Sequence, residues 1–168
     1  MKETVTQKEY ALIFNKDKCV LCHACETACK IHNNLETGVS WRKVKSVWQG
    51  SYPAVNSTNI SFSCMHCAEP ECMEACPVDA ITKNLDGIVL VDDELCIGCR
   101  SCFDACPVKI PQFGENDKMQ KCNLCVDRLK KGETPVCADT CPGGAIEVKI
   151  IHTSDKIKLE KEMTDYFR

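Results

Sequence analysis

The sequence predicts an α+β fold built from two pseudo-symmetric units, with the central unit inserted in the other. Three observations lead to this prediction: sixteen cysteines form four groups of four, short apolar runs flank the groups, and proline follows the last cysteine of three groups. The inserted unit is expected over residues 64–106, and the outer unit over residues 1–29 together with 107–151. Residues 30–63 should connect them, and residues 152–168 should form a tail.

The composition leaves little ordinary apolar material for a core. Of the 168 residues 44% are hydrophobic, but sixteen of these are cysteines, and there are only five Phe, three Tyr and two Trp. Metal centres should therefore make up much of the interior, and the metal-free chain should fold poorly. The net charge of −3 gives no basic surface of the kind that binds nucleic acid.

The cellular compartment decides between metal binding and disulfides, because dense cysteines also occur in secreted domains. The first eight residues, MKETVTQK, lack the apolar stretch of a signal peptide. No apolar run is long enough for a transmembrane helix, so we expect no membrane span. A cytoplasmic chain with free thiols is the expectation, and export together with a partner that carries a signal is the alternative.

The spacing of the cysteines points to iron–sulfur clusters. The groups are Cys19, Cys22, Cys25, Cys29; Cys64, Cys67, Cys72, Cys76; Cys96, Cys99, Cys102, Cys106; and Cys122, Cys125, Cys137, Cys141. Three thiolates two residues apart can curl around one [4Fe–4S] cubane, while the fourth, at a helix start, binds the other cluster of a pair, as in bacterial two-cluster ferredoxins. Pro77, Pro107 and Pro142 suit that helix start, and Lys30 departs from the rule. Four clusters are predicted, two in each ferredoxin-like unit.

Other uses of the cysteines fit less well. Disulfides do not require a repeated C-x2-C-x2-C-x3-C pattern, and structural zinc prefers two C-x2-C pairs for each ion, which only the fourth group offers. Histidines are not needed as ligands, so His23 and His66 are expected on the loop surface, with tuning of a cluster as the alternative. Lys30 and Lys121 lie next to cysteines and should raise cluster potentials.

Short β-prone runs frame the cysteine groups. Tyr10–Phe14 precedes the first group and Ala145–Ile151 follows the fourth, and we expect the two runs to pair and bring the chain ends together. Between the second and third groups, Ala80–Lys83 and Ile88–Val91 flank the turn Asn84–Gly87, which predicts a hairpin.

The remaining segments carry weaker signals. Residues 30–63 should be partly ordered on the clusters, with Trp41 and Trp48 as packed cover; an electron pathway or a partner contact is the alternative. Residues 107–121 are expected to form a surface loop.

The tail after the fourth group has a weak helical period. It predicts a solvated surface helix that begins near Ser154 or Asp155, where either side chain could provide the cap. Docking of this helix on a partner is the alternative.

The order and gaps of the groups resemble those of the iron–sulfur (beta) subunits of the dimethyl sulfoxide reductase family. The resemblance covers residues 16–148 and is carried by KDKCVLCHACETACK, GVSWRKV, SCMHCAEPECMEACPVDAI, CIGCRSCFDACPVKIPQFG and KMQKCNLCVDRLKKGETPVCADTCPGGAI. It implies four ligand sets: Cys19, Cys22, Cys25 and Cys141; Cys122, Cys125, Cys137 and Cys29; Cys64, Cys67, Cys72 and Cys106; and Cys96, Cys99, Cys102 and Cys76. In the family, the first set lies nearest the catalytic subunit and the last lies at the distal end.

The resemblance implies a subunit that is not an enzyme by itself. It would relay single electrons through four [4Fe–4S] clusters to or from a large molybdenum or tungsten pterin subunit, with a further redox subunit as a second candidate partner. A cubane with four thiolates has no open iron, so catalysis belongs to the partner. The chain has no C-x-x-C-H haem motif and no G-x-G-x-x-G loop, so a partner must carry another cofactor.

Subunits of two other kinds of enzyme complex also resemble the chain. Compact four-cluster subunits occur in tungsten aldehyde oxidoreductase and benzoyl-coenzyme A reductase complexes, and the chain is shorter than most relatives in the dimethyl sulfoxide reductase family. A free polyferredoxin, which would serve either several enzymes or a hydrogenase, is the remaining alternative. A native protein that runs alone would favour the free carrier.

Overall fold

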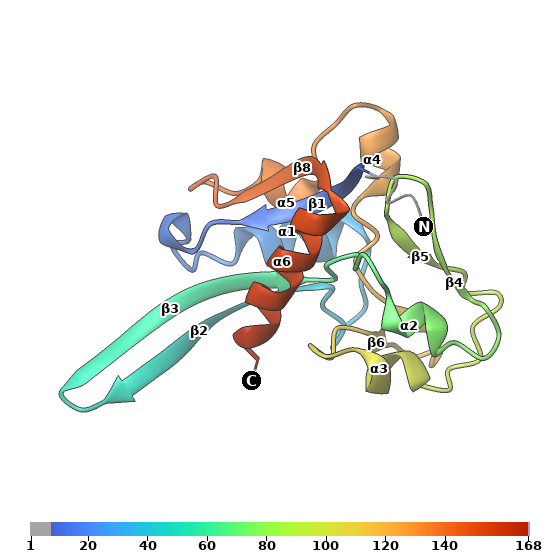
Figure 1. The fold of residues 1–168 in the computed structure, drawn as a ribbon, viewed down its shortest axis with the longest axis horizontal. Helices are drawn as coiled ribbons and strands as arrows, with labels where there is room; N and C mark the ends of the chain where they lie inside the picture. The colour runs from blue at the N-terminus through green and yellow to red at the C-terminus, as the bar shows by residue number, and fades with distance from the viewer. Residues whose placement is uncertain (1–7, 168) are drawn as a thin grey trace, which may run out of the picture.

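The computed structural model describes residues 8–167 and shows short helices and two-stranded antiparallel sheets (Figure 1). The strands are β1 (Lys8–Phe14), β2 (Arg42–Ser51), β3 (Ala54–Ser63), β4 (Ile81–Lys83), β5 (Val89–Val91), β6 (Gln112–Phe113), β7 (Met119–Gln120) and β8 (Ile146–His152). The helices are the 3₁₀ helix η1 (Lys16–Lys18), α1 (Ala24–His32), α2 (Glu71–Glu74), α3 (Ser101–Ala105), α4 (Val126–Lys130), α5 (Val136–Asp139) and α6 (Thr153–Asp165). In this part of the chain, no helix has the length and apolar character needed to cross a bilayer.

Strands β1 and β8 pair along their whole length, as the β-prone runs at the chain ends predicted. The register runs from Lys8 opposite His152 to Phe14 opposite Ile146. The ladder is extended by the Asn15 amide, which donates to the Ala145 carbonyl at 2.8 Å. The first and fourth cysteine groups are thereby brought side by side.

The predicted hairpin between the second and third groups is also present. Strands β4 and β5 pair with Ile81 opposite Val91, and the Gly87 amide donates to the Asn84 carbonyl at 3.0 Å. Gly87 is required here for two reasons: its φ is +77°, and a Cβ atom would lie 2.5 Å from Cβ of Glu9. The hairpin therefore packs closely on β1.

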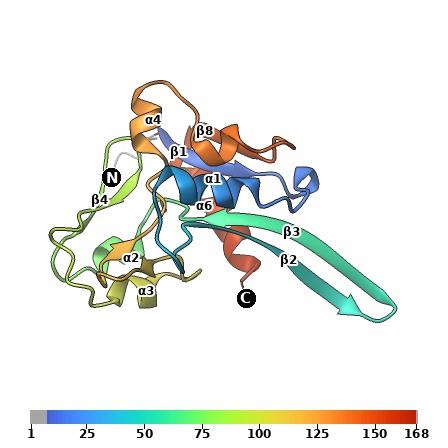
Figure 2. The same ribbon diagram turned by 180° about the vertical axis from the view of Figure 1, so that it is seen from behind.

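Residues 30–63 form a structure that the sequence did not predict. Strands β2 and β3 make a ten-residue antiparallel pair, here called the arm, which projects from the body (Figures 1 and 2). The expectation that Trp48 is packed cover is wrong, because 69% of this residue is exposed on the arm. Trp41, at the root, is half-buried.

Residues 107–121 are not the surface loop that was expected. Strands β6 and β7 pair with Phe113 opposite Met119, and Val108, Ile110 and Met119 are buried. These apolar side chains pack inward because they help to enclose the cysteines, as described below.

The tail is a helix, but it differs in detail from the prediction. Helix α6 begins at Thr153 after His152, and no side chain caps it, so neither Ser154 nor Asp155 is the cap. One face of the helix lies against β1 and β8 and buries Lys156, while its other residues are exposed or partly exposed, so it is a surface helix docked on its own chain (Figure 1). It also reaches the second cysteine group, since Glu160 accepts a hydrogen bond from the Ala68 amide at 2.8 Å.

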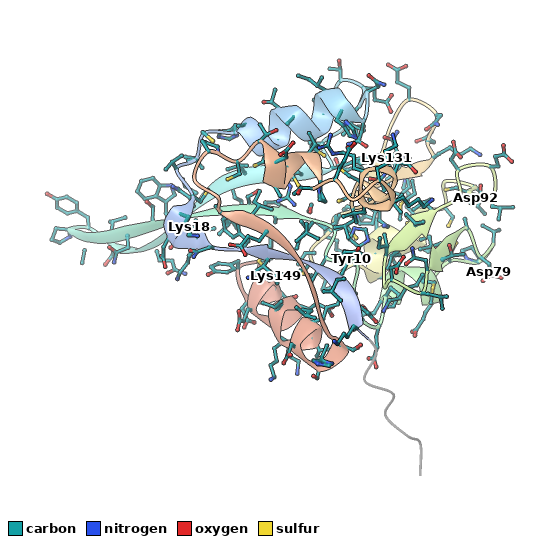
Figure 3. All side chains as sticks on the ribbon, turned by 90° about the horizontal axis from the view of Figure 1, so that it is seen from above. Tyr10, Lys18, Asp79, Asp92, Lys131 and Lys149 are labelled. Atoms are coloured by element: carbon teal, nitrogen blue, oxygen red, sulfur yellow. The ribbon has the colours of Figure 1, made fainter. Side chains whose placement is uncertain are left out.

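Cysteines take part in both apolar cores, as the composition suggested. One core contains Cys102 with Ile81, Val89 and Met119. The other contains Cys25 and Cys137 with Ile146. The side-chain view places Asp79 and Asp92 at the end of the molecule opposite the arm, and Lys18 near the root of the arm (Figure 3).

Candidate metal centres

All sixteen cysteines lie in the described part of the chain and have free thiols. Within residues 8–167, no three Cys, His, Asp or Glu side chains are placed to hold one metal ion between them. Instead, sets of four cysteines surround shared spaces, and each set combines cysteines from two groups of the sequence.

The first such space is a cavity lined by Cys64, Cys67, Cys72 and Cys106, here called the Cys64 cavity. The first three belong to the second group, whereas Cys106 ends the third. Val89, Val108 and Ile110 give the cavity apolar walls, and Lys121 also lines it. The buried residues of 107–121 therefore help to close this site.

The second space, the Cys96 cavity, is lined by Cys96, Cys99, Cys102 and Cys76. It mirrors the first, because Cys76 now comes from the second group. Ile81, Val91 and Met119 form apolar walls, and Arg100 stands at the edge. Arg100 pairs with Asp117 at 2.8 Å, with both side chains more than half exposed.

The third space, the Cys19 cavity, joins the two ends of the sequence. It is lined by Cys19, Cys22, Cys25 and Cys141, and its walls include Phe14, Val44, Ser61 and Ile146. The pairing of β1 with β8 brings Cys141 to the first group, and the root of the arm closes one side through Val44 and Ser61.

The last four cysteines are the most deeply buried set, namely Cys29, Cys122, Cys125 and Cys137. Burial raises the pKa of Cys29 to about 12, and the nearby Cys122, Cys137 and Cys125 add to the rise. Cys29 therefore lies among cysteines of the fourth group, although it belongs to the first. Three of the four sets that the family resemblance implied each line one cavity, and in the remaining set α1 with Cys29 packs against α5 with Cys137. Their role as cluster ligands stays a prediction.

The cysteine loops repeat one backbone conformation. The residue before the second cysteine of a group has a positive φ in all four groups, at Leu21, His66, Gly98 and Leu124. The third residue after the last cysteine does so in three groups, at Asp79, Lys109 and Gly144. Left-handed residues turn successive N–H groups toward one side and make concavities for anions. Most of these residues are not glycine, so the repeat leaves no signal in the amino-acid sequence.

The amides of these loops point at sulfur. The His66 and Leu124 amides donate to Sγ of Cys64 and Cys122, both at 3.4 Å. After the last cysteines, the amides of Ile110 and Ala145 donate to Sγ of Cys106 and Cys141 at 3.5 and 3.3 Å. Hydrogen bonds of this kind favour thiolates and raise the reduction potential of a bound cluster. The backbone amides that donate to sulfur, together with the cysteines that enclose each cavity, therefore fit a [4Fe–4S] cubane.

Burial makes several of the thiols resist ionisation, and it raises the pKa of Cys102 and of Cys122 to about 11. Ligation needs thiolates, so cluster assembly must release protons from these thiols. At the exposed Cys99, the hydrogen bond with Ser101 acts in the opposite direction and lowers the pKa.

Only two of the sixteen cysteines are exposed, Cys22 and Cys99. Each is the second cysteine of a C-x2-C-x2-C-x3-C group, and an exposed apolar residue lies two positions before it, Val20 at 67% and Ile97 at 65%. They belong to the Cys19 cavity and the Cys96 cavity, which are therefore the two sites with cysteine at the surface.

His66 is buried, so the expectation that it lies on the loop surface is wrong, whereas His23 is exposed as expected. The Val89 amide donates to Nδ1 of His66 at 3.1 Å, which leaves the hydrogen on Nε2. This Nε2 has no partner among the described residues. Burial lowers the pKa of His66 well below its usual range, and the charges of Lys121 and Lys156 act in the same direction. His66 is therefore neutral.

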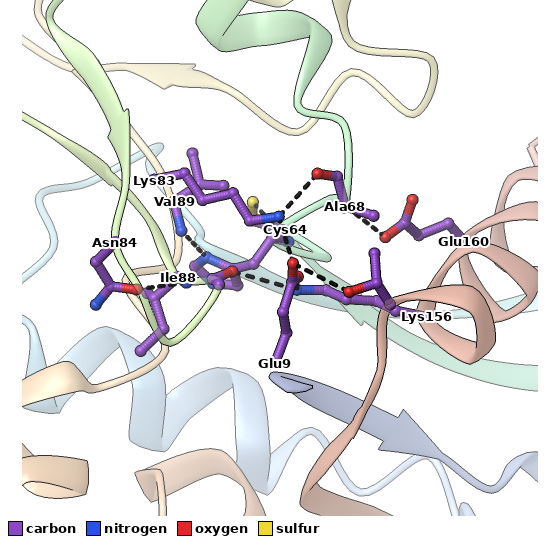
Figure 4. Close-up of polar contacts among 12 residues, drawn as sticks. Glu9, Cys64, Ala68, Lys83, Asn84, Ile88, Val89, Lys156 and Glu160 are labelled. Atoms are coloured by element: carbon purple, nitrogen blue, oxygen red, sulfur yellow. Dashed lines mark hydrogen bonds and ion pairs between the residues drawn. The ribbon is translucent and has the colours of Figure 1, made fainter. Parts of the chain in front are cut away.

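A buried ionic network, which the sequence did not predict, links the elements around the sites (Figure 4). The Glu9 carboxylate on β1 binds the ammonium groups of Lys156 at 2.7 Å and Lys83 at 2.8 Å. Lys156 also donates to the Gly87 carbonyl at 3.2 Å, and Lys83 to the Ala68 carbonyl at 2.8 Å. Charged residues are ordinarily exposed, which is why sequence reasoning missed this network.

Comparison with known proteins places these sites in context. A family described as "4Fe-4S dicluster domain" matches residues 55–151, and one described as "4Fe-4S binding domain" matches residues 16–38. The sequence is 37% identical to one chain of the anaerobic dimethyl sulfoxide reductase of Haemophilus influenzae, over 83% of the present protein and 73% of that relative. It is 36% identical to the formate dehydrogenase iron-sulfur subunit of Wolinella succinogenes, over 84% and 80% of the two proteins. With the thiosulfate reductase electron transfer subunit of Salmonella typhi it shares 36% identity, over 83% and 74%.

Proposed function

Because the chain belongs to the iron–sulfur electron-transfer subunits of the dimethyl sulfoxide reductase family, we propose that it carries electrons for a large molybdenum or tungsten pterin enzyme. Four [4Fe–4S] clusters would supply one-electron outer-sphere transfer. The observation that supports this best is that twelve cysteines line three cavities in sets of four, while the other four are buried near one another. Four thiolates saturate a cubane, so the chain has the features of a relay and its partner would perform the catalysis.

The ligand sets that we propose are Cys19, Cys22, Cys25 and Cys141; Cys29, Cys122, Cys125 and Cys137; Cys64, Cys67, Cys72 and Cys106; and Cys76, Cys96, Cys99 and Cys102. The three cysteine-lined cavities and the buried neighbourhood of Cys29 support them. In this arrangement the unit of residues 64–106 is inserted in the unit formed by 1–29 and 107–151. The repeated backbone conformation of the cysteine loops supports this pseudo-symmetry.

The contacts between sets suggest one linear order. Cys25 packs with Cys137 in one core, which joins the Cys19 set to the Cys29 set. Lys121, the residue before Cys122, lines the Cys64 cavity, which joins the Cys29 set to the Cys64 set. Cys72 packs against the core that contains Cys102, which joins the Cys64 set to the Cys96 set. Electrons would therefore pass between the exposed Cys22 and Cys99 ends.

The Cys22 end is the proposed contact with the pterin subunit, and the arm supports this. Val44 and Ser61 of the arm line the Cys19 cavity, and Asn59 donates to the Cys19 carbonyl at 3.2 Å. Residues 46–63 carry no charge, and Tyr52 at the tip is almost fully exposed. An isolated two-stranded ribbon is marginally stable in water, and exposed aromatics without charges are typical of interface cores. The Cys99 end, with Ile97 and Leu95 exposed, would serve a further redox subunit.

Anaerobic purification of the native complex tests the proposal. Iron and acid-labile sulfide should each amount to about sixteen per chain, four per cluster, and a large chain with molybdenum or tungsten should co-purify. A zinc-loaded protein without acid-labile sulfide would overturn the cluster assignment. A lone monomer that reduces several unrelated enzymes equally well would instead identify a free polyferredoxin.

A further inference from the structure

Arg42, at the start of β2, is a buried cation without a carboxylate partner among residues 8–167. Only 3% of the residue is exposed. Its guanidinium donates to Oγ of Ser61 and to Oγ of Ser63, both at 2.9 Å, and forms no ion pair with a described acidic side chain. Burying an uncompensated charge is unfavourable, so a negative group other than a carboxylate should balance it.

The groups that face Arg42 are cysteines of two different sets. Strand β2, which begins at Arg42, packs against α1, the helix that carries Cys25 of the Cys19 set and Cys29 of the Cys29 set, and Arg42 and both cysteines are buried. Arg42 therefore stands at the junction between the two sets. With clusters bound, each set would carry net negative charge there, which is what the buried guanidinium requires.

Ser61 connects the guanidinium to one sulfur directly. Its Oγ accepts from Arg42, so its single hydrogen is free to point elsewhere, and Sγ of Cys25 lies 3.4 Å away. A thiolate ligand can only accept, which orders the chain of hydrogen bonds as guanidinium to hydroxyl to sulfur. Ser61 is itself buried, so water does not compete for this bond.

We propose that Arg42 and Ser61 are positioning residues that raise the reduction potentials of two neighbouring clusters, those on Cys25 and on Cys29. This inference rests on the proposed function. Reduction moves one electron onto a cluster from a reduced neighbour, and a fixed buried cation stabilises the added charge. Arginine keeps its proton throughout. The charge acts on both clusters, whereas the Ser61 hydrogen bond acts on the Cys25 cluster alone.

Because the charge acts on two clusters and the hydrogen bond on one, each variant should shift a different set of midpoint potentials. A redox titration of the holoprotein, followed by electron paramagnetic resonance, measures these potentials. Arg42→Gln should shift two of four midpoint potentials to more negative values, and Ser61→Ala only one of those two. Arg42→Lys keeps the positive charge but loses the guanidinium that donates to two serines, and it should shift the same potentials less than Arg42→Gln does. Ser63→Ala is the matched control, because it removes a hydroxyl from the same guanidinium without a sulfur contact and should leave all four unchanged. Ligand variants Cys22→Ser and Cys125→Ser assign the potentials.

The outcomes separate this inference from the proposed function. If the wild-type chain does not bind four clusters, the proposed function itself is wrong. If it holds them and Arg42→Gln leaves every potential in place, or moves all four equally, the role of Arg42 is refuted. Should Arg42→Gln fail to assemble, Ser61→Ala and Arg42→Lys decide: an unchanged Cys25 cluster in both overturns the proposal.

Discussion

The Lys156 ammonium lies 2.7 Å from the Glu9 carboxylate, and both side chains are buried. The pair joins the last helix, α6, to the first strand, β1. Lys83 binds the other carboxylate oxygen and adds the β4–β5 hairpin to the same junction (Figure 4). One carboxylate thus holds together the chain ends and the central hairpin, and it does so beside the second cysteine group.

Replacing this carboxylate should weaken the fold strongly. Glu9→Gln removes the paired carboxylate from the buried Lys156 and the partly buried Lys83, and breaking a buried pair in this way costs about 3–5 kcal/mol. Urea unfolding of the holoprotein, followed by cluster absorbance, measures the loss. Lys149→Met removes an exposed pair with Glu147 and should leave the unfolding midpoint unchanged. Equal losses in the two variants would contradict the role of the buried pair.

The same pair predicts a pH dependence. Burial acts to raise the pKa of Glu9, but the hydrogen bonds from Lys156 and Lys83 outweigh it and the net pKa is lowered. A lowered pKa in the folded state contributes stability above the ordinary value of 4.5, and this stability is lost as the pH falls from there through the lowered pKa. The stability difference between wild type and Glu9→Gln should therefore shrink in acid. A constant difference below pH 4.5 would argue against it.

The arm should bind the catalytic subunit through its aromatic side chains. Trp48→Ala and Tyr52→Ala each remove an exposed ring, and truncation of a central aromatic in an interface typically costs about 2 kcal/mol, or roughly 30-fold in Kd. Iron content should not change, because neither residue lines a cysteine cavity. Leu95→Ala, at the opposite end, is the matched control and should bind the catalytic subunit normally. Weaker binding for Leu95→Ala alone would place the partner at the Cys99 end.

The parts of the structure that the sequence predicted are those with a local pattern. The β-prone runs at Tyr10–Phe14 and Ala145–Ile151 pair as expected, and the Asn84–Gly87 turn closes its hairpin. Cysteine spacing predicted crossed sets and the family resemblance named them; three of these sets line cavities, and ligation by all four stays a prediction. These predictions depend on residue types with strong local preferences: β-prone apolar residues, a glycine in a turn, and cysteines at fixed spacing.

The parts that were missed depend on tertiary context. The arm places Val47 and Trp48 side by side in β2, so this strand lacks the strict alternation of apolar and polar residues that marks a strand with one buried face. Glu9, Lys156 and Arg42 are charged and would ordinarily be exposed, and only their partners in space explain their burial. His66 is buried and has a φ of +51°, and the sequence of its loop predicts neither feature.

Cysteine-to-serine variants should report the crossed arrangement directly. Cys29 is four residues from Cys25 in sequence, but the structure places it among Cys122, Cys125 and Cys137. A serine ligand perturbs chiefly the cluster that it binds, so Cys29→Ser should alter the same midpoint potential as Cys125→Ser, while Cys25→Ser alters a different one. A redox titration followed by electron paramagnetic resonance distinguishes the two cases. If Cys29→Ser and Cys25→Ser act on one cluster and Cys125→Ser on another, each cysteine group holds its own cluster and the crossed assignment is wrong.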